Sequence, residues 1–213
     1  MRAWIVVAIV CCASGLASAQ GLFLQKGTSG YGADVGLSTD GGFVGFGVDV
    51  GASYEGWLDA QLAVNATQLD PADFDGDAVA GYGFVPGVAL HPVKQNATTP
   101  VSIAVGTDLA FYTYSGGPEG MSAWAIDGWA TLYRFVKLAS NYGVIPGVQL
   151  TYSHFTSRID SFSASSDDVA VSLGGHFAWL LDKGYMITAT PGITFGSESP
   201  VFSLTVGALR ALP

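Results

Sequence analysis

Residues 101–134 read VSIAVGTDLAFYTYSGGPEGMSAWAIDGWATLYR, and this stretch decides the fold. Apolar residues alternate with small or polar residues on both sides of a Gly/Pro break at 115–118. Alternation with a period of two on either side of a turn predicts a long antiparallel β-hairpin. One face of the hairpin is apolar. The other is small and polar, and it includes Asp108 and Asp127.

The apolar face of this hairpin belongs either in the core of a soluble sandwich or against lipid. Charged residues make up 12% of the chain and its mean hydropathy is +0.39, whereas ordinary soluble domains carry about twice that share of charge. No apolar run of transmembrane-helix length follows residue 20. In lipid, only helices and closed barrels satisfy their backbone hydrogen bonds. We therefore predict an all-β fold, an antiparallel up-and-down transmembrane β-barrel of eight to ten strands, with a soluble secreted all-β binding domain as the alternative.

The N-terminus has the pattern of an export signal. Arg2 precedes an apolar run at 3–12, and a small-residue site, Ala-Ser-Ala, ends at residue 19. This is the layout of a cleaved secretory signal peptide. Cleavage there removes both cysteines of the chain, which suits a bacterial envelope protein that does without disulfides. We expect a signal peptide at 1–19, a short leader at 20–30 and the β-barrel domain at 31–213.

Turn residues divide the rest of the chain into ten strands, or into eight if 31–50 is irregular. Short turns are predicted at 51–53 and 181–184, and longer polar loops at 66–77 and 157–166. Outer-membrane barrels place short turns in the periplasm and longer loops outside. The loop lengths therefore predict which end of the barrel faces out.

Aromatic residues on the apolar faces gather near the strand ends, as two membrane–water interfaces require. With the orientation above, two girdles are predicted. The periplasmic girdle consists of Tyr54, Tyr142, Trp179 and Tyr185, and the outer girdle includes Tyr82, Phe111, Trp124 and Tyr152.

With this pattern of strands, turns and aromatic bands, the chain resembles the small bacterial outer-membrane β-barrel proteins over nearly its whole mature length. The resemblance implies a monomer in the outer membrane of a Gram-negative-type bacterium. Its partners would be the lipid bilayer and, as a further candidate, lipopolysaccharide. The formal charge of −9 argues against nucleic acid. We expect a structural, adhesive or weakly pore-forming role rather than catalysis.

The inward face is predicted to be acidic, with no lysine or arginine on it by alternation. The predicted acidic cluster of the lumen, with one histidine, consists of Asp49, Glu55, Asp59, Asp108, Asp127 and His176, and Asp34 shares their face. A hairpin centred between Gly117 and Pro118 pairs Phe111 with Trp124 outside and Asp108 with Asp127 inside. Directly opposed like charges destabilise a sheet, so a retained proton, a cation or a water must relieve them. A two-residue register slip would instead leave the aspartates diagonal.

Signals for catalysis and metal binding are weak. His154 lies on the predicted lipid side near the outer end of a strand, and outer-membrane lipid A deacylases are similar in placing a histidine and a serine there. However, Thr156 stands where the nucleophilic serine is expected, and no orienting carboxylate can be assigned. A lipid-modifying enzyme is therefore the alternative function. The aspartates at 70–77 lack the glycine and glutamate of an EF-hand. No catalytic residue, metal or cofactor is predicted.

Overall fold

The computed structural model describes residues 24–39, 43–69, 79–116, 121–159, 162–181, 184–196 and 199–212. These residues form eleven β-strands and no helix. The strands are β1 (Ser29–Thr39), β2 (Phe43–Tyr54), β3 (Leu58–Leu69), β4 (Ala80–Val93), β5 (Ser102–Ser115), β6 (Ser122–Tyr133), β7 (Val136–Lys137), β8 (Tyr142–Ile159), β9 (Phe162–Leu180), β10 (Tyr185–Phe195) and β11 (Val201–Leu212). The predicted signal peptide and the aspartates at 70–77 lie outside the described residues.

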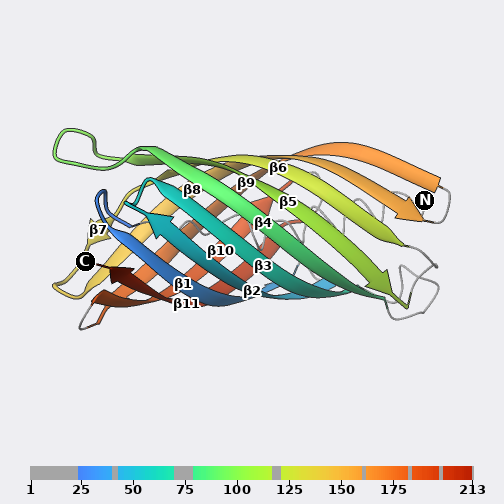
Figure 1. Cartoon of the computed structure of the whole chain (residues 1–213), viewed down its shortest axis with the longest axis horizontal. Helices are drawn as coiled ribbons and strands as arrows, with labels where there is room; N and C mark the ends of the chain where they lie inside the picture. Colours follow the sequence, from blue (N-terminus) through green and yellow to red (C-terminus); the bar gives the residue numbers. More distant parts are fainter. Residues whose placement is uncertain are drawn as a thin grey trace.

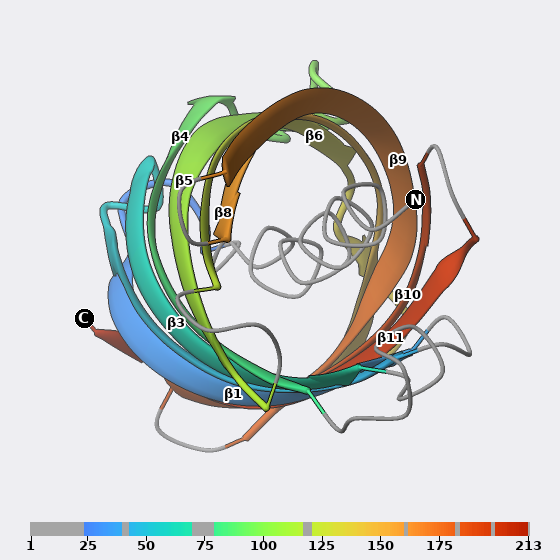
Figure 2. The same cartoon turned by 90° about the vertical axis from the view of Figure 1, so that its right-hand side faces the viewer.

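The strands close into a barrel (Figures 1 and 2). Each long strand pairs antiparallel with its neighbours in the sequence, and β1 pairs with β11 over its whole length. The two-residue β7 is bypassed, because β6 pairs directly with β8. The ring therefore contains ten long strands, the upper end of the predicted range, and 31–50 is regular. No long strand has a free edge, so the ladders satisfy the backbone without water.

The two faces of the barrel are inverted relative to a soluble protein. Large apolar side chains point outward and are exposed, such as Val64 at 56% and Phe84 at 48%. Polar side chains point inward and are buried, such as Asn65 at 3% and Gln149 at 5%. Soluble monomers rarely expose a continuous apolar surface of this kind, whereas membrane barrels turn their apolar residues toward lipid. The alternation predicted from the sequence is therefore confirmed, and the fold is a barrel of the membrane type. No helix of membrane-spanning length and hydrophobicity occurs in the described residues.

Three predicted boundaries are wrong. The loop expected at 66–77 begins too early, because residues 66–69 continue β3. The expected loop at 157–166 is mostly strand, because β8 has 18 residues and β9 has 19. About 9–11 residues suffice for a strand to cross a bilayer, so this hairpin extends beyond the other strands. Its hydroxyl-rich sequence was mistaken for a loop, yet it continues the ladder to Ile159 opposite Phe162. The tight turn expected at 51–53 lies at 55–57 instead.

The barrel has two distinct ends. We call the end that carries residues 55–57, 94–101, 134–141, 181 and 184 the turn end. The opposite end, where β3 and β8 end and β4 and β9 begin, is the loop end. In Figure 1 the turn end is the one beside β7. The start of β1 and the end of β11 both lie there, because these two strands pair antiparallel.

The assignment of faces predicts unequal effects of the same substitution. Val148→Arg places a charge on the exposed apolar face and should lower the free energy of unfolding by about 2–4 kcal/mol in lipid. Thr131→Arg, on the inward face of the neighbouring strand, should be much milder because the lumen already holds polar groups. Urea titration of protein refolded in lipid vesicles measures both. Equal losses of unfolding free energy in the two variants would contradict the assignment of the outward and inward faces.

Candidate functional site in the barrel interior

The predicted register of the central hairpin is confirmed. Asp108 on β5 stands directly opposite Asp127 on β6, and Phe111 stands opposite Trp124. Both aspartates are 0% exposed. The slipped register, which would have left the two carboxylates diagonal, does not occur. Two carboxyl groups therefore meet inside the barrel.

The two opposed carboxylates have unequal surroundings. Trp129 Nε1 donates a hydrogen bond to Asp108 Oδ2 at 2.8 Å, and Gln61 Nε2 donates to Oδ1 at 3.0 Å. The Ser153 hydroxyl, opposite on β8, is the hydrogen-bonding neighbour of the Asp127 carboxylate. Neither oxygen of Asp127 has a bond of good geometry with a described residue. Asp108 is thus held in place by neutral donors, and Asp127 retains acceptor capacity facing the interior.

The remaining members of the predicted acidic cluster do not form one group. Asp34 and Asp49 face each other across β1 and β2, and Asp59 contacts a histidine described below. His176 on β9 is bonded through Nδ1 to the Thr190 hydroxyl at 2.7 Å. Glu55 was assigned wrongly to the lumen. It is exposed in the turn at 55–57 with φ of 49°, because β2 ends one residue before it.

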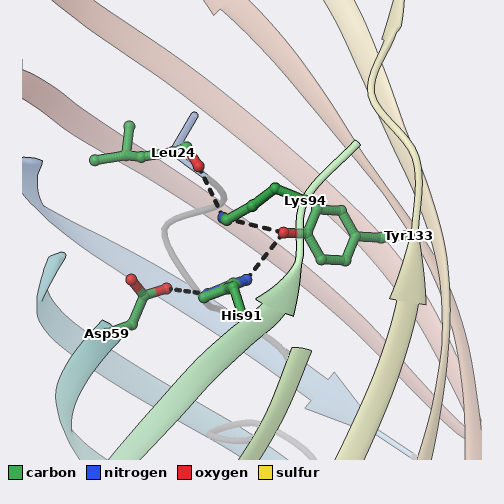
Figure 3. A network of polar contacts seen from close by, with 5 residues as sticks. All are labelled: Leu24, Asp59, His91, Lys94 and Tyr133. Carbon is green, nitrogen blue, oxygen red and sulfur yellow. Dashed lines mark hydrogen bonds and ion pairs between the residues drawn. The ribbon is translucent and has the colours of Figure 1, made fainter. Parts of the chain in front are cut away.

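A chain of polar contacts crosses the turn end of the lumen (Figure 3). Asp59 Oδ2 accepts from His91 Nε2 at 2.8 Å, and His91 Nδ1 lies 2.9 Å from the Tyr133 hydroxyl. Because a carboxylate only accepts, Nε2 carries the hydrogen and Tyr133 donates to Nδ1. The Tyr133 oxygen in turn accepts from Lys94 Nζ at 3.2 Å. These donors and acceptors link β3, β4 and β6 inside the barrel.

The same chain of contacts holds the segment before β1. Lys94 Nζ donates to the Leu24 carbonyl at 2.8 Å, and the Leu24 side chain is 7% exposed. Gly56, with φ of 65°, lies against the backbone of Leu24 and Gln25, where a Cβ would collide with the Gln25 carbonyl. Burial lowers the pKa of Lys94 to about 8, although the nearby Asp59 carboxylate opposes the shift. Residues 24–28 are thereby fastened across the turn end.

The outer surface near the loop end carries a second polar group. His154 Nδ1 lies 2.8 Å from Asp167 Oδ1, and the Tyr152 hydroxyl donates to the same oxygen at 2.9 Å. The side chains of His154 and Asp167 are 41% and 59% exposed. Two residues nearer the loop end on each strand, the hydroxyls of Thr156 and Ser165 are 2.9 Å apart. The structure therefore supplies the carboxylate partner for His154 that the sequence analysis did not assign.

The predicted girdle residues lie mostly on the exposed outer face. Tyr142 is half-buried and packs its ring against Trp179 at a centroid distance of 5.2 Å. Tyr54, Tyr142, Trp179 and Tyr185 lie at the turn end of their strands. The other seven are exposed by 39–57%: Tyr54, Tyr82, Phe111, Trp124, Tyr152, Trp179 and Tyr185.

Solved structures of outer-membrane proteins have a similar architecture. The β-domain of the Bordetella autotransporter BrkA is similar with 13% identity over 87% of this chain and 100% of that one, at a TM-score of 0.50. An outer-membrane channel from Pseudomonas putida is similar with 9% identity over 91% and 99%, at a TM-score of 0.54. The chain has the fold of the bacterial outer-membrane β-barrels. No family model and no curated protein matches the sequence of this barrel.

Several partners in the barrel interior were missed from sequence. Trp129 was placed on the inward face, and a diagonal neighbour across a ladder lies within reach of a long side chain, so its bond to Asp108 follows from the confirmed register. Alternation also turns His91 inward, but its pairing with Asp59 requires the β3–β4 register. Alternation assigns no face to Lys94 or Leu24, because both residues lie outside the strands.

Lys94 should make stability depend on pH. Its pKa is lowered to about 8 in the folded barrel, against about 10.4 in an unfolded chain. Between these values the unfolded state binds more protons, so the contribution of Lys94 to stability rises with pH. We expect the free energy of unfolding of wild type, relative to Lys94→Met, to increase from pH 8 to pH 10 in urea titrations in detergent. Exposed Lys137→Met is the control, and the same trend in both variants would contradict the assignment.

Proposed function

We propose that this protein is exported with cleavage of residues 1–19 and inserts as a monomer into the outer membrane of a Gram-negative-type bacterium. There it conducts small cations weakly through its acidic interior. The apolar outer face and the barrel fold support the membrane location. The turn end would face the periplasm, as the short turns of such barrels do. The bilayer and lipopolysaccharide are its partners in this proposal.

The observation that carries the pore function is the opposition of Asp108 and Asp127 with both side chains fully buried. Burying a charged group without a compensating partner is costly, and a scaffold or adhesin gains nothing from such a pair inside its wall. Local rules of this kind are broken chiefly at functional sites. The Asp127 carboxylate keeps acceptor capacity, so this pair can bind a proton, a water or a cation.

The charge distribution of the lumen favours cations over anions. Aspartates at 34, 49, 59, 108, 127 and 168 face inward, whereas no lysine or arginine does so on the described strands. Arg158 and Arg210 lie on the exposed face. Rings of acidic side chains select cations in channels, and a low-dielectric wall strengthens their field. The buried Lys94 adds one positive charge at the turn end of the path.

The pore is tested in planar bilayers. Under a KCl gradient, we expect small unitary currents with a reversal potential on the cation-selective side. The double variant Asp108→Asn, Asp127→Asn should move that potential toward zero, because it removes the central negative charges. Asp167→Asn removes a carboxylate from the outer surface and should leave the potential unchanged. Anion selectivity, or equal shifts in both variants, would contradict the proposal.

A second candidate, a lipid-modifying enzyme, is favoured by one observation. The bond from His154 to Asp167 at 2.8 Å holds Nδ1 and leaves Nε2 turned away from the carboxylate, as a general base requires. The Thr156 and Ser165 hydroxyls lie nearby on the same surface. However, no nucleophile is bonded to the histidine, and the Thr156 and Ser165 hydroxyls contact each other. An interfacial polar group accounts for the arrangement without catalysis.

The enzyme alternative makes a distinct prediction about lipid chemistry. We expect mass spectrometry to find the same lipid A species in cells that express wild type, His154→Ala or no protein. A deacylated species that appears with wild type and disappears with folded His154→Ala would overturn this expectation and establish hydrolysis at the outer surface.

A further inference from the structure

The outward face of the barrel carries an isolated positive charge near the turn end. It belongs to Arg210 on β11, which is exposed and lies beside β1 (Figure 1). The other charged or histidine side chains that point outward from the ten long strands are His154, Arg158 and Asp167, all near the loop end. A charge on the lipid face of a barrel destabilises it unless the charge lies near an interface. Arg210 therefore marks the level at which the outer surface meets lipid headgroups.

Two tyrosines flank Arg210 on the neighbouring strands. Tyr31 on β1 and Tyr185 on β10 each stand directly opposite Arg210 in their ladders. The guanidinium carbon lies 5.2 Å from the centre of the Tyr185 ring, and the Tyr31 hydroxyl is the hydrogen-bonding neighbour of the guanidinium. An aromatic ring attracts a cation placed over its face. These contacts hold the arginine at the level of the predicted periplasmic girdle, to which Tyr185 belongs.

The guanidinium keeps donors for an anion from outside the protein. Among the described residues, no carboxylate forms an ion pair with Arg210. A guanidinium has five N–H donors in a planar fork, and the Tyr31 hydroxyl accounts for only part of them. Two oxygens of a phosphate match this fork bidentately. The arrangement therefore suits a phosphate group that approaches from the outer surface.

The apolar surface next to Arg210 indicates where such a phosphate comes from. Toward the loop end, the next outward positions on the same three strands are Ala33, Ala208 and Ile187, followed by Val35, Val206 and Ala189. All six side chains are apolar, so acyl chains attached to the phosphate can lie along them and remove apolar surface from water. A soluble phosphate ion gains nothing from this surface. A lipid headgroup is the anion that both parts of the surface fit.

We propose that Arg210, together with Tyr31 and Tyr185, binds the phosphate of an anionic phospholipid in the leaflet that the turn end reaches. This site presupposes the proposed membrane location but not the pore. Phosphatidylglycerol fits best, because its headgroup carries no cation. In phosphatidylethanolamine the ammonium of the same headgroup competes with the guanidinium for the phosphate. Anionic lipids attract basic side chains near the membrane surface, and the bound lipid would lie against the β1–β11 ladder that closes the barrel.

Native mass spectrometry of the full barrel in detergent, with graded amounts of phosphatidylglycerol, tests the site. We expect one phosphatidylglycerol retained per chain at low lipid concentration, and weaker retention of phosphatidylethanolamine. Arg210→Gln should weaken the retention of that lipid at least tenfold, because it removes the charged fork. Arg158→Gln removes the arginine of the outward face near the loop end. It is the matched control and should retain the lipid like wild type.

Two further variants separate the contributions of charge and geometry, with folding judged by heat-modifiable migration on gels. Arg210→Lys keeps the charge without the fork, and Tyr185→Leu keeps the charge without the ring. Each should weaken retention severalfold, but less than Arg210→Gln.

Three results would overturn the site: equal weakening by Arg158→Gln, displacement of the lipid by inorganic phosphate, or tighter binding of lipid A than of phosphatidylglycerol. Cation-selective current without lipid retention would reject this site alone. Lipid retention without current would support the site and reject the pore alone.

Discussion

The structure depends on one constraint, that every backbone amide and carbonyl of a membrane-spanning strand must be hydrogen-bonded within the protein. The chain meets it by pairing β1 with β11 and β6 with β8, so that ten strands form a ring without an edge. Closure then determines the rest. Each strand has one face toward lipid and one toward the lumen, and alternation along the sequence decides which residues go where.

Closure also concentrates polar groups where water is scarce. Ten strands turn half of their side chains into a narrow interior, and on the described strands six of those are aspartates. Register brings four of them together as Asp34–Asp49 and Asp108–Asp127. Asp59 belongs to neither pair, and it is bonded to His91, a diagonal neighbour on β4. The buried opposition of Asp108 and Asp127 is the feature that a structural role does not explain, and it is the basis of the proposed pore.

Alternation and turn composition were enough to predict the barrel, the faces of the strands and the pairing of the central hairpin. These two signals failed where apolar and polar residues do not alternate along the chain. At 157–166 both faces are hydroxyl-rich, so a projecting strand pair reads as a loop. At 51–57 glycine and small residues continue the β2 ladder, and the turn moves to Glu55 and Gly56, where positive φ is required. Two kinds of contact could not be predicted from local sequence. Lys94 and Leu24 both lie outside the strands, and the contact of His154 with Asp167 requires the register of the β8–β9 hairpin.

Oxygen accessibility along β6 tests whether the apolar face of the barrel points toward lipid and the polar face toward the lumen. Single cysteines carrying a nitroxide label would be placed in turn from Ala123 to Leu132, in a chain whose Cys11 and Cys12 are replaced by serine, and reconstituted in lipid vesicles. Collision with dissolved oxygen should alternate with a period of two and peak at the outward positions Trp124, Ile126, Ala130 and Leu132. A profile without alternation, or with peaks at Ala125, Asp127 and Thr131, would contradict the account.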